Sequence, residues 1–269
     1  MVKYAEELEE KYMELSSTFQ KDEDYFGIGL GHGNTVIVME YIGGTEHDVD
    51  VVIFKERLVA AFVSDNGPTN GKTFTETAAC MPSSLPYDKQ RQLITVVYRC
   101  CTKIGLANGV FNVEIKMIST GPKLVEINGR MDGFYLRDWI KKLYAVDLVM
   151  CAFMVSYGIK PYCPEIKPKG QFMGFMCIPS LHSHMLNDPD TLSRRQELES
   201  KGIIHFNQFD EHAVIGKDGF EDPFASVAVL EKDKPSAKEK LLQLAKDLIL
   251  WVLLTTMQTS SKISKPSTS

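Results

Sequence analysis

Apolar residues recur at helical spacing in four parts of the chain. The period predicts an amphipathic helix near the first residues, a second helix opened by Pro86 and closed by Gly105, a long apolar helical stretch and a last helix. Ser236 and Glu239 form a capping-box pattern, which predicts where the last helix begins. In chain order, the helical segments are residues 3–19, 86–105, 134–158 and 236–249.

Runs of β-branched and aromatic residues predict strands between these helices. Residues 48–54 and 58–63 flank a short polar turn, as do residues 110–117 and 123–128, so each pair predicts a hairpin. Residues 27–34 carry glycine at every second position, but they precede a strand-like run, which favours a loop over a dinucleotide-binding fingerprint. The other strand-like runs are residues 35–41, 171–178, 202–207 and 225–230.

Three prolines divide the chain into two folded regions. Pro161, Pro164 and Pro168 interrupt the helical pattern, and we place a domain boundary there. The last residues are rich in serine, threonine and lysine, which predicts a disordered tail. The expected regions are a catalytic module over residues 1–160, a smaller α+β lid over residues 161–258 and a tail over residues 259–269.

Composition excludes several classes of partner. The 269 residues are 44% hydrophobic and 24% charged, as in globular domains, and a net charge of −5 argues against a surface that binds nucleic acid. The longest apolar run, residues 248–254, is far short of the roughly 20 residues that span a bilayer, and no apolar leader follows Met1. Six cysteines without Cys-x-x-Cys spacing favour reduced thiols. We therefore expect a cytoplasmic protein without a membrane partner, and homo-oligomerisation stays open.

The second hairpin carries the residues that favour a chemical site. Glu114 points away from the apolar face of its strand, and Glu126 and Asn128 do the same in the next strand. If Glu114 lies opposite Glu126, Asn112 lies opposite Asn128, and both carboxylates project from one face with Cβ atoms about 4.5–5.5 Å apart. A slip of one residue would put the carboxylates on opposite faces, so the hypothesis depends on register.

Like charges across a β-ladder are destabilising unless they are neutralised. A divalent cation held by the two carboxylates and an amide oxygen is one solution, and it is typical of Mg²⁺ sites. A solvated hairpin face, with Lys116 and Lys123 softening the repulsion, is the other. His182 and His184 indicate a weaker metal hypothesis, because no third ligand is near, and we interpret them as part of a solvated loop.

The order of these residues resembles the metal-binding core of the ATP-grasp ligases. In that family a strand with one glutamate precedes Glu-x-Asn-x-Arg, which here spans Glu126 to Arg130. Upstream, MEYIGGTEHDVD at residues 39–50 resembles the nucleotide hinge. Four further strings resemble the branch of the family that joins β-alanine or γ-aminobutyrate to histidine: SDNGP (64–68), FTETAACMPS (74–83), GVFNVEIK (109–116) and GFYLRDWIKKLY (133–144).

The resemblance implies an α+β, ATP-grasp fold and a role for each matching residue. The main chain of the hinge would hold the adenine of ATP, Glu46 would accept hydrogen bonds from the ribose, and Arg130 would hold the substrate carboxylate and then the acyl phosphate. Without the resemblance, the same residues are compatible with an edge strand, a loop carboxylate and a surface arginine. The implied sets are Glu40, Tyr41, Ile42 and Glu46 for ATP; Glu114, Glu126 and Asn128 for Mg²⁺ or Mn²⁺; Glu76, Arg130 and Gly133 for the amino acid substrates; and Arg130 for catalysis.

The implied activity is ATP-dependent ligation of a small ω-amino acid to L-histidine through an acyl phosphate, with release of ADP and phosphate. Gly129 replaces a proline of the family pattern and loosens the backbone, and Asp132 replaces a glycine and adds negative charge near the acyl phosphate. No lysine and glycine-rich-loop pair precedes the hinge. We therefore expect a partial fold that lacks the amino-terminal domain and the phosphate-covering loop. The alternative is a truncated, catalytically inactive relative that binds a nucleotide or an amino acid.

Overall fold

The computed structural model describes residues 5–19, 38–67, 77–133, 135–212, 215, 221 and 223–247. The chain falls into two compact units, Met1–Gly43 and Gly44–Ser269. The first unit contains helix α1 (Ala5–Phe19), which confirms the first predicted helix. The predicted glycine-rich loop and the predicted tail lie outside the described residues.

The strand predicted over residues 35–41 is wrong for the part that the structure describes. Residues 38–43 have no regular secondary structure, and the side chains of Val38 and Tyr41 are 67% and 59% exposed. A β-branched run becomes a strand only where a neighbouring backbone supplies the ladder of hydrogen bonds. The apolar pattern alone therefore misassigned this segment.

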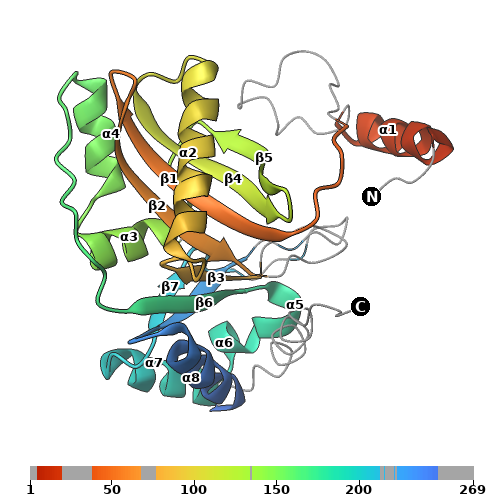
Figure 1. Cartoon of the computed structure of the whole chain (residues 1–269). Coiled ribbons are helices and arrows are strands. Elements are labelled where there is room, and N and C mark those ends of the chain that lie inside the picture. The colour runs from red at the N-terminus through yellow and green to blue at the C-terminus, as the bar shows by residue number, and fades with distance from the viewer. Residues whose placement is uncertain are drawn as a thin grey trace, which may run out of the picture. The chain divides into compact units, whose positions relative to one another are not determined.

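The second unit is built on one antiparallel sheet (Figure 1). Within the described ranges the strand order is β5-β4-β1-β2-β3-β6-β8-β7, and every neighbouring pair is antiparallel. The strands are β1 (Thr45–Phe54), β2 (Arg57–Asn66), β3 (Ala78–Met81), β4 (Gly109–Ile118), β5 (Gly121–Asn128), β6 (Gln171–Cys177), β7 (His205–Gln208) and β8 (Ala225–Glu231).

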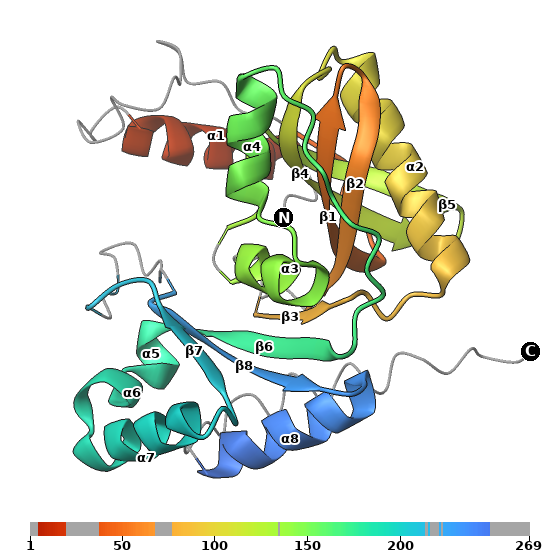
Figure 2. The same ribbon diagram turned by 90° about the vertical axis from the view of Figure 1, so that its left-hand side faces the viewer.

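Helices cover both faces of this sheet (Figure 2). Helix α2 packs on one face of β1, β2 and β4, while α3 and α4 pack on the opposite face of the same strands. Helices α6, α7 and α8 pack against β6 and β8. Among the described residues, no helix is both long and apolar enough to cross a bilayer. The helices are α2 (Tyr87–Lys103), α3 (Leu136–Tyr144), α4 (Leu148–Ser156), α5 (Pro179–His182), α6 (His184–Asn187), α7 (Pro189–Ser200) and α8 (Lys234–Asp247).

The first predicted hairpin is confirmed as β1 and β2. Phe54 lies opposite Arg57, so Lys55 and Glu56 form a two-residue turn, and both have positive φ, 49° and 61°. Positive φ at both central residues defines the type I′ turn, whose twist matches that of the flanking strands. The turn therefore connects the two strands, and a β-bulge between Val52 and Ile53 then shifts the register in which the polar residues of β1 pair with β2.

The long helical stretch predicted over residues 134–158 is two helices. Ala145 has a left-handed backbone with φ 55° and ends α3. The side chain of Asp147 then begins α4, because its Oδ1 accepts hydrogen bonds from the main chain of Val149 at 3.1 Å and Met150 at 3.2 Å. Apolar periodicity does not reveal such a break.

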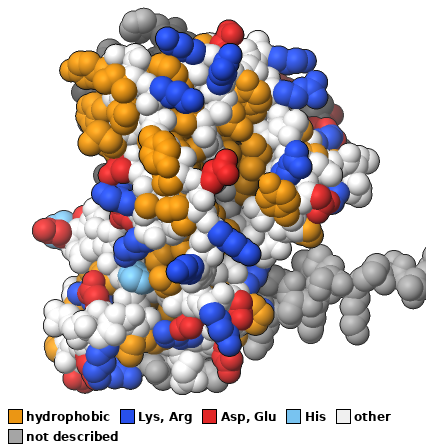
Figure 3. All heavy atoms as spheres, turned by 60° about the vertical axis from the view of Figure 1, so that its left-hand side comes forward, with side chains coloured by type: hydrophobic (Ala, Val, Ile, Leu, Met, Phe, Trp, Pro, Cys, Tyr) orange, Lys and Arg blue, Asp and Glu red, His pale blue; other side chains and the backbone are white. Residues whose placement is uncertain are grey.

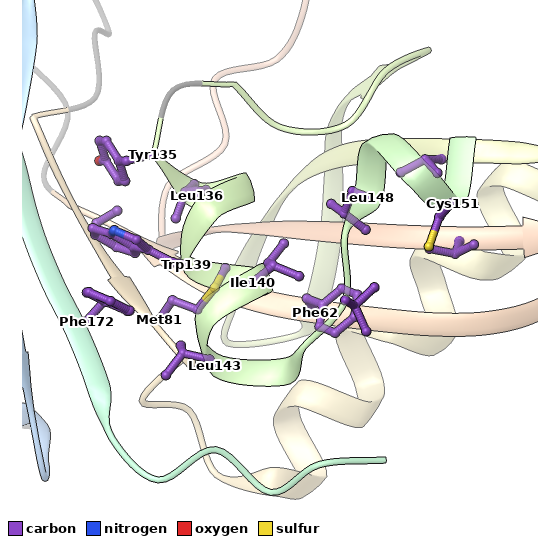
Figure 4. Close-up of a cluster of buried hydrophobic side chains, with 14 of the residues drawn as sticks. Phe62, Met81, Tyr135, Leu136, Trp139, Ile140, Leu143, Leu148, Cys151 and Phe172 are labelled. Atoms are coloured by element: carbon purple, nitrogen blue, oxygen red, sulfur yellow. The ribbon is translucent and has the colours of Figure 1, made fainter. Parts of the chain in front are cut away.

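A buried cluster joins α3 and α4 to the sheet (Figure 4). Trp139 of α3 stacks on Phe172 of β6, with ring centroids 5.0 Å apart and 9° between the planes. The same cluster includes Val52 of β1 and Phe62 of β2. The sheet and its core thus continue from β3 to β6, and the domain boundary near Pro161 stays a prediction.

In the carboxy-terminal region the predicted start of the last helix is wrong, and three helices were not predicted. Helix α8 begins at Lys234, and Asp233 caps it by accepting a hydrogen bond from the main chain of Ser236 at 2.9 Å, so Ser236 is inside the helix. Helices α5 to α7 were not predicted, because two of them are a single turn long and carry no apolar period. Pro179 and Pro189 stand at the first helical positions of α5 and α7.

Candidate active site

One face of β1 and β4 changes from apolar to acidic along its length. Val52 of β1 and Val110 of β4 pack into the cluster under α3 and α4. Further along the same face stand Asp50 and Asp48 of β1 and then Asn112 and Glu114 of β4. Asp48, Asp50 and Asn112 are each at most 3% exposed. Polar side chains are therefore concentrated on the part of this face that lies beyond the apolar cluster of α3 and α4.

The predicted register of the second hairpin is confirmed. Glu114 lies opposite Glu126, and Asn112 lies opposite Asn128. A bulge follows at once, because Ile115 pairs with Leu124. The side-chain amide of Asn128 donates to Oδ1 of Asn112 at 3.2 Å and reaches Oε1 of Glu114 at 3.4 Å. The two carboxylates and the amide thus come together as the sequence predicts.

The acids on this face are crowded by one another. Burial raises the pKa of Glu114, and the charges of Glu126 and Glu46 raise it further, against a hydrogen bond from Asn128. Burial also raises the pKa of Asp48 well above its usual range, with the charge of Asp132 as the next cause. The pKa of Asp50 rises to about 7, mainly through burial. A positive charge at this face would relieve these carboxylates.

The loop after β5 is held to the acidic face by its main chain. The N–H of Asn112 donates to the carbonyl oxygen of Arg130 at 2.6 Å, and the N–H of Asp132 donates to Oδ1 of Asp50 at 2.9 Å. Arg130 is exposed, and its Nη1 donates to the carbonyl of Met131 at 3.0 Å. Its charge lowers the pKa of both Asp50 and Glu114, so the guanidinium lies near the carboxylates.

Asp132 and Gly133 form the end of this loop. The N–H of Gly133 donates to Oδ1 of Asp132 at 2.5 Å. The carboxylate of Asp132 also acts on Asp48, whose pKa it raises. The residue that departs from the family pattern therefore adds to the acidic cluster.

The predicted ATP-binding residues fall in both units. Glu40, Tyr41 and Ile42 belong to the first unit. Glu46 belongs to the second, where its Oε2 forms an ion pair with Nζ of Lys116 at 3.0 Å and both side chains are 13% exposed. Glu76 lies outside the described residues.

The donor set fits a hard divalent cation. Glu114, Glu126 and Asn128 offer oxygen atoms, which Mg²⁺ and Mn²⁺ prefer, and burial and the charges of Glu126 and Glu46 both raise the pKa of Glu114. In the part of the chain that the structure describes, no three side chains of the His, Cys, Asp and Glu types are grouped to hold a metal by themselves. A metal here would therefore need the amide of Asn128 and further ligands from nucleotide phosphates or water.

The histidine pair does not lie in a solvated loop, so that interpretation is wrong. His182 ends α5, is 3% exposed, and its Nδ1 accepts a hydrogen bond from the main chain of Ile178 at 2.9 Å. Burial lowers the pKa of His182 to about 4, so the ring is neutral near pH 7. His182 is a structural residue of the helical turn.

A pocket of about 280 Å³ lies elsewhere, between α3, β7 and β8. Its lining includes Trp139, Lys142 and His205, and none of the predicted site residues. Nζ of Lys142 is 3.1 Å from Nδ1 of His205. Lys142 and His205 thus already contact one another.

Sequence reasoning missed Asp48 and Asp50 as parts of the site. A signal was present, because Asp48 and Asp50 alternate with valines just before the apolar residues 51–54. Such a pattern is typical of an exposed strand face as well. Only the structure, in which both acids are buried, distinguishes a buried acidic site from an exposed strand face.

The comparisons show that the chain has an ATP-grasp fold. The family described as "ATP-grasp in the biosynthetic pathway with Ter operon" matches residues 32–135. The L-amino acid ligase from Bacillus licheniformis covers 91% of this chain and 60% of its own, with a TM-score of 0.71 and 15% identity. N5-carboxyaminoimidazole synthase from Aspergillus clavatus covers 76% of this chain and 51% of its own, with a TM-score of 0.58 and 14% identity. The predicted fold class is confirmed.

Within this class the chain is similar to carnosine synthase 1. The human protein is 44% identical over 249 residues, which are 92% of this chain and 30% of the relative. The protein of Gallus gallus is 44% identical over 236 residues, which are 87% of this chain and 25% of the relative. The resemblance predicted from the motifs is confirmed, and the chain spans less than a third of the length of these relatives.

Proposed function

We propose that this chain is the nucleotide- and metal-binding part of an ATP-dependent carboxylate–amine ligase, which joins a small ω-amino acid to histidine. The observation that carries the proposal is the register that sets Glu114 opposite Glu126, beside the loop of Arg130. Similarity to carnosine synthase 1 and to an L-amino acid ligase supports the reaction class.

The acidic face is the proposed metal site. Glu114, Glu126 and the amide oxygen of Asn128 would hold Mg²⁺ or Mn²⁺ together with phosphate oxygens of ATP. When bound, the ion supplies positive charge that neutralises the phosphates during transfer. Rotation of the Asn128 side chain would turn its oxygen toward the ion, because its amide nitrogen now donates to Glu114 and Asn112.

The nucleotide is proposed to bind through the hinge. Main-chain groups of Tyr41 and Ile42, which lie in a segment without regular secondary structure, would hold the adenine edge, with Glu40 beside them. Glu46 would accept hydrogen bonds from the ribose hydroxyls. The ion pair with Lys116 holds the carboxylate of Glu46 in place, and its oxygen atoms can accept hydrogen bonds.

Arg130 is the proposed catalytic residue. A carboxylate oxygen of one substrate would attack the γ-phosphorus of ATP, which forms an acyl phosphate and releases ADP. The amine of the second substrate would then attack the acyl carbon and release phosphate. The guanidinium of Arg130 would hold the carboxylate and then the acyl phosphate, with Gly133 and Glu76 as neighbours for the substrates.

The test is ATP turnover by the Glu126→Gln variant. This change keeps size and removes one negative charge from the proposed metal site, so we expect ADP formation in the presence of both amino acids to be abolished. Glu165→Gln is the matched control, since Glu165 is exposed in the segment before β6. Normal turnover in Glu126→Gln would contradict the proposal.

A second function is favoured by Asp132. Its negative charge lies beside Asp48 and near the place where the acyl phosphate would form. Such a charge would oppose the intermediate, and the chain would then act as a nucleotide- or amino-acid-binding protein. Binding of Mg-ADP without ADP production from ATP, restored to production by Asp132→Gly, would select this second function.

A further inference from the structure

Two cysteines face each other behind α4. Cys151 lies in α4 and Cys163 in the segment that follows, and their Sγ atoms are 3.9 Å apart. Cys151 is 5% exposed and belongs to the cluster in Figure 4, and Cys163 is partly exposed and packs against that cluster. Neither thiol has a role in the ligase reaction proposed above.

The path to a disulfide between them is short. A disulfide needs its sulfur atoms about 2.05 Å apart, so the two Sγ atoms must approach by about 2 Å. Cys163 stands within residues 159–168, which have no regular secondary structure. Rotation of the side chains with a small shift of this segment can therefore close the distance while α4 stays in place.

The two thiols differ in a way that assigns their order of reaction. Cys163 is partly exposed, whereas Cys151 is 5% exposed. An external disulfide can therefore reach Cys163 first, and Cys151, whose Sγ lies 3.9 Å away, attacks second.

Three other cysteines are protected from this chemistry. Burial raises the pKa of Cys80 to about 12 and that of Cys101 to about 11, and it raises the pKa of Cys177 further. Cys100 is partly exposed, so it is the natural control. We therefore expect disulfide formation at Cys151 and Cys163 and not at the other cysteines.

We propose that Cys151 and Cys163 are a disulfide-forming site that reacts with low-molecular-weight disulfides such as oxidised glutathione. The Cys163 thiolate attacks one sulfur of oxidised glutathione, forms a mixed disulfide and releases one reduced glutathione. The Cys151 thiol then loses its proton to water, attacks Sγ of Cys163 and releases the second glutathione. Two protein thiols are oxidised and one glutathione disulfide is reduced to two thiols, so the electrons balance.

The bond would tie α4 to the segment that leads into β6. The outer side of α4 is apolar and open, because Met150, Phe153 and Tyr157 are 57%, 61% and 82% exposed, and hydrophobic side chains gather in the upper half of the face in Figure 3.

The cross-link closes a short loop of the chain and removes conformational freedom from the unfolded state. The oxidised protein should therefore melt several degrees higher than the reduced protein.

The experiment is thiol mapping of the full chain. Reduced, desalted protein is incubated with oxidised glutathione at neutral pH, denatured in a thiol-blocking reagent, and examined by intact mass and peptide mapping. We expect the loss of two free thiols and a linked peptide pair that contains Cys151 and Cys163. The Cys100→Ser variant should form the same bond.

Two variants separate the steps. Cys151→Ser should trap one glutathione on Cys163, because the second thiol is gone, and Cys163→Ser should keep all of its remaining thiols free. An unmodified wild-type chain, a bond that maps to other cysteines, or a Cys151→Ser variant without an adduct would each overturn the proposal. Mapping of the wild-type chain needs no variant, so the test does not depend on whether each variant folds.

Discussion

Asp65 of β2 and the acids of the candidate site on β1 and β4 have opposite surroundings. Asp65 of β2 is ringed by donors: Nδ1 of His47 lies at 3.1 Å, the N–H of Ser84 at 2.8 Å and Nζ of Lys234 at 3.3 Å, and the hydroxyl of Ser83 also donates. Burial alone would raise the pKa of Asp65, but the hydrogen bonds from His47, Ser83 and Ser84 lower it overall.

The acids of the candidate site have other acids as neighbours. Burial raises the pKa values of Asp48, Asp50 and Glu114, and neighbouring acids raise them further: Asp132 acts on Asp48, Asp48 on Asp50, and Glu126 and Glu46 on Glu114. A carboxylate that the protein itself surrounds with donors stabilises the fold. Carboxylates that face one another would instead be stabilised by a cation from outside the chain.

Removal of Asp65 should give the largest loss of stability. Asp65→Ala leaves His47 and Lys234 without their buried anion, and we expect the free energy of unfolding at pH 7 to fall by about 3 kcal/mol. The folded pKa of Asp65 lies below its unfolded value, so its stabilisation is present at neutral pH and lost as the pH falls below about 4. Urea unfolding at pH 7 and at about pH 2 measures both effects, and equal losses at the two pH values would contradict the assignment.

Asp50→Asn should have the opposite sign. The pKa of Asp50 is about 7 in the folded chain, against roughly 3.9 when unfolded, so the folded state loses stability as the pH rises from 4 to 7. Asparagine removes that loss and can still accept the hydrogen bond from Asp132. We expect the variant to be more stable than the wild type by roughly 2 kcal/mol at pH 7 and similar to it at pH 4. A difference in the free energy of unfolding that is the same at pH 4 and pH 7 would contradict the raised pKa of Asp50.

A smaller effect is expected from Mg²⁺ on the wild-type chain. At ten times its Kd, a cation that binds only the folded chain adds about 1.4 kcal/mol to the free energy of unfolding. Thermal unfolding with Mg²⁺, and again after a chelator, measures this gain. Glu165→Gln should respond as the wild type does, whereas Glu126→Gln should not respond. An equal response in Glu126→Gln would place the cation elsewhere.

The site hairpin was predictable because strands have a period of two. The alternation of Phe111, Val113 and Ile115 placed Glu114 on the opposite face, and the register that pairs it with Glu126, which was a condition of the prediction, also pairs Asn112 with Asn128. The bulge at Ile115 was not visible in the sequence, but it begins one residue beyond the site and leaves the pairing of Glu114 unchanged.

Other features were not predictable because they depend on distant contacts. Burial of Asp48 and Asp50 follows from the loop after β5, more than 80 positions along the chain, whose Asp132 N–H donates to Asp50. The end of α3 at Ala145 depends on one left-handed backbone conformation that an alanine does not signal. Tertiary structure decides both cases, so local pattern alone could not.

The central claim is that Glu114 and Glu126 form a working metal–nucleotide site, and calorimetric titration with Mg-ADP tests it most directly. The wild-type chain is titrated beside the Glu114→Gln/Glu126→Gln double variant, with Glu165→Gln as the control for charge. The account predicts binding to the wild type and the control, and loss of binding in the double variant. Equal affinity of the double variant and the wild type for Mg-ADP would contradict it.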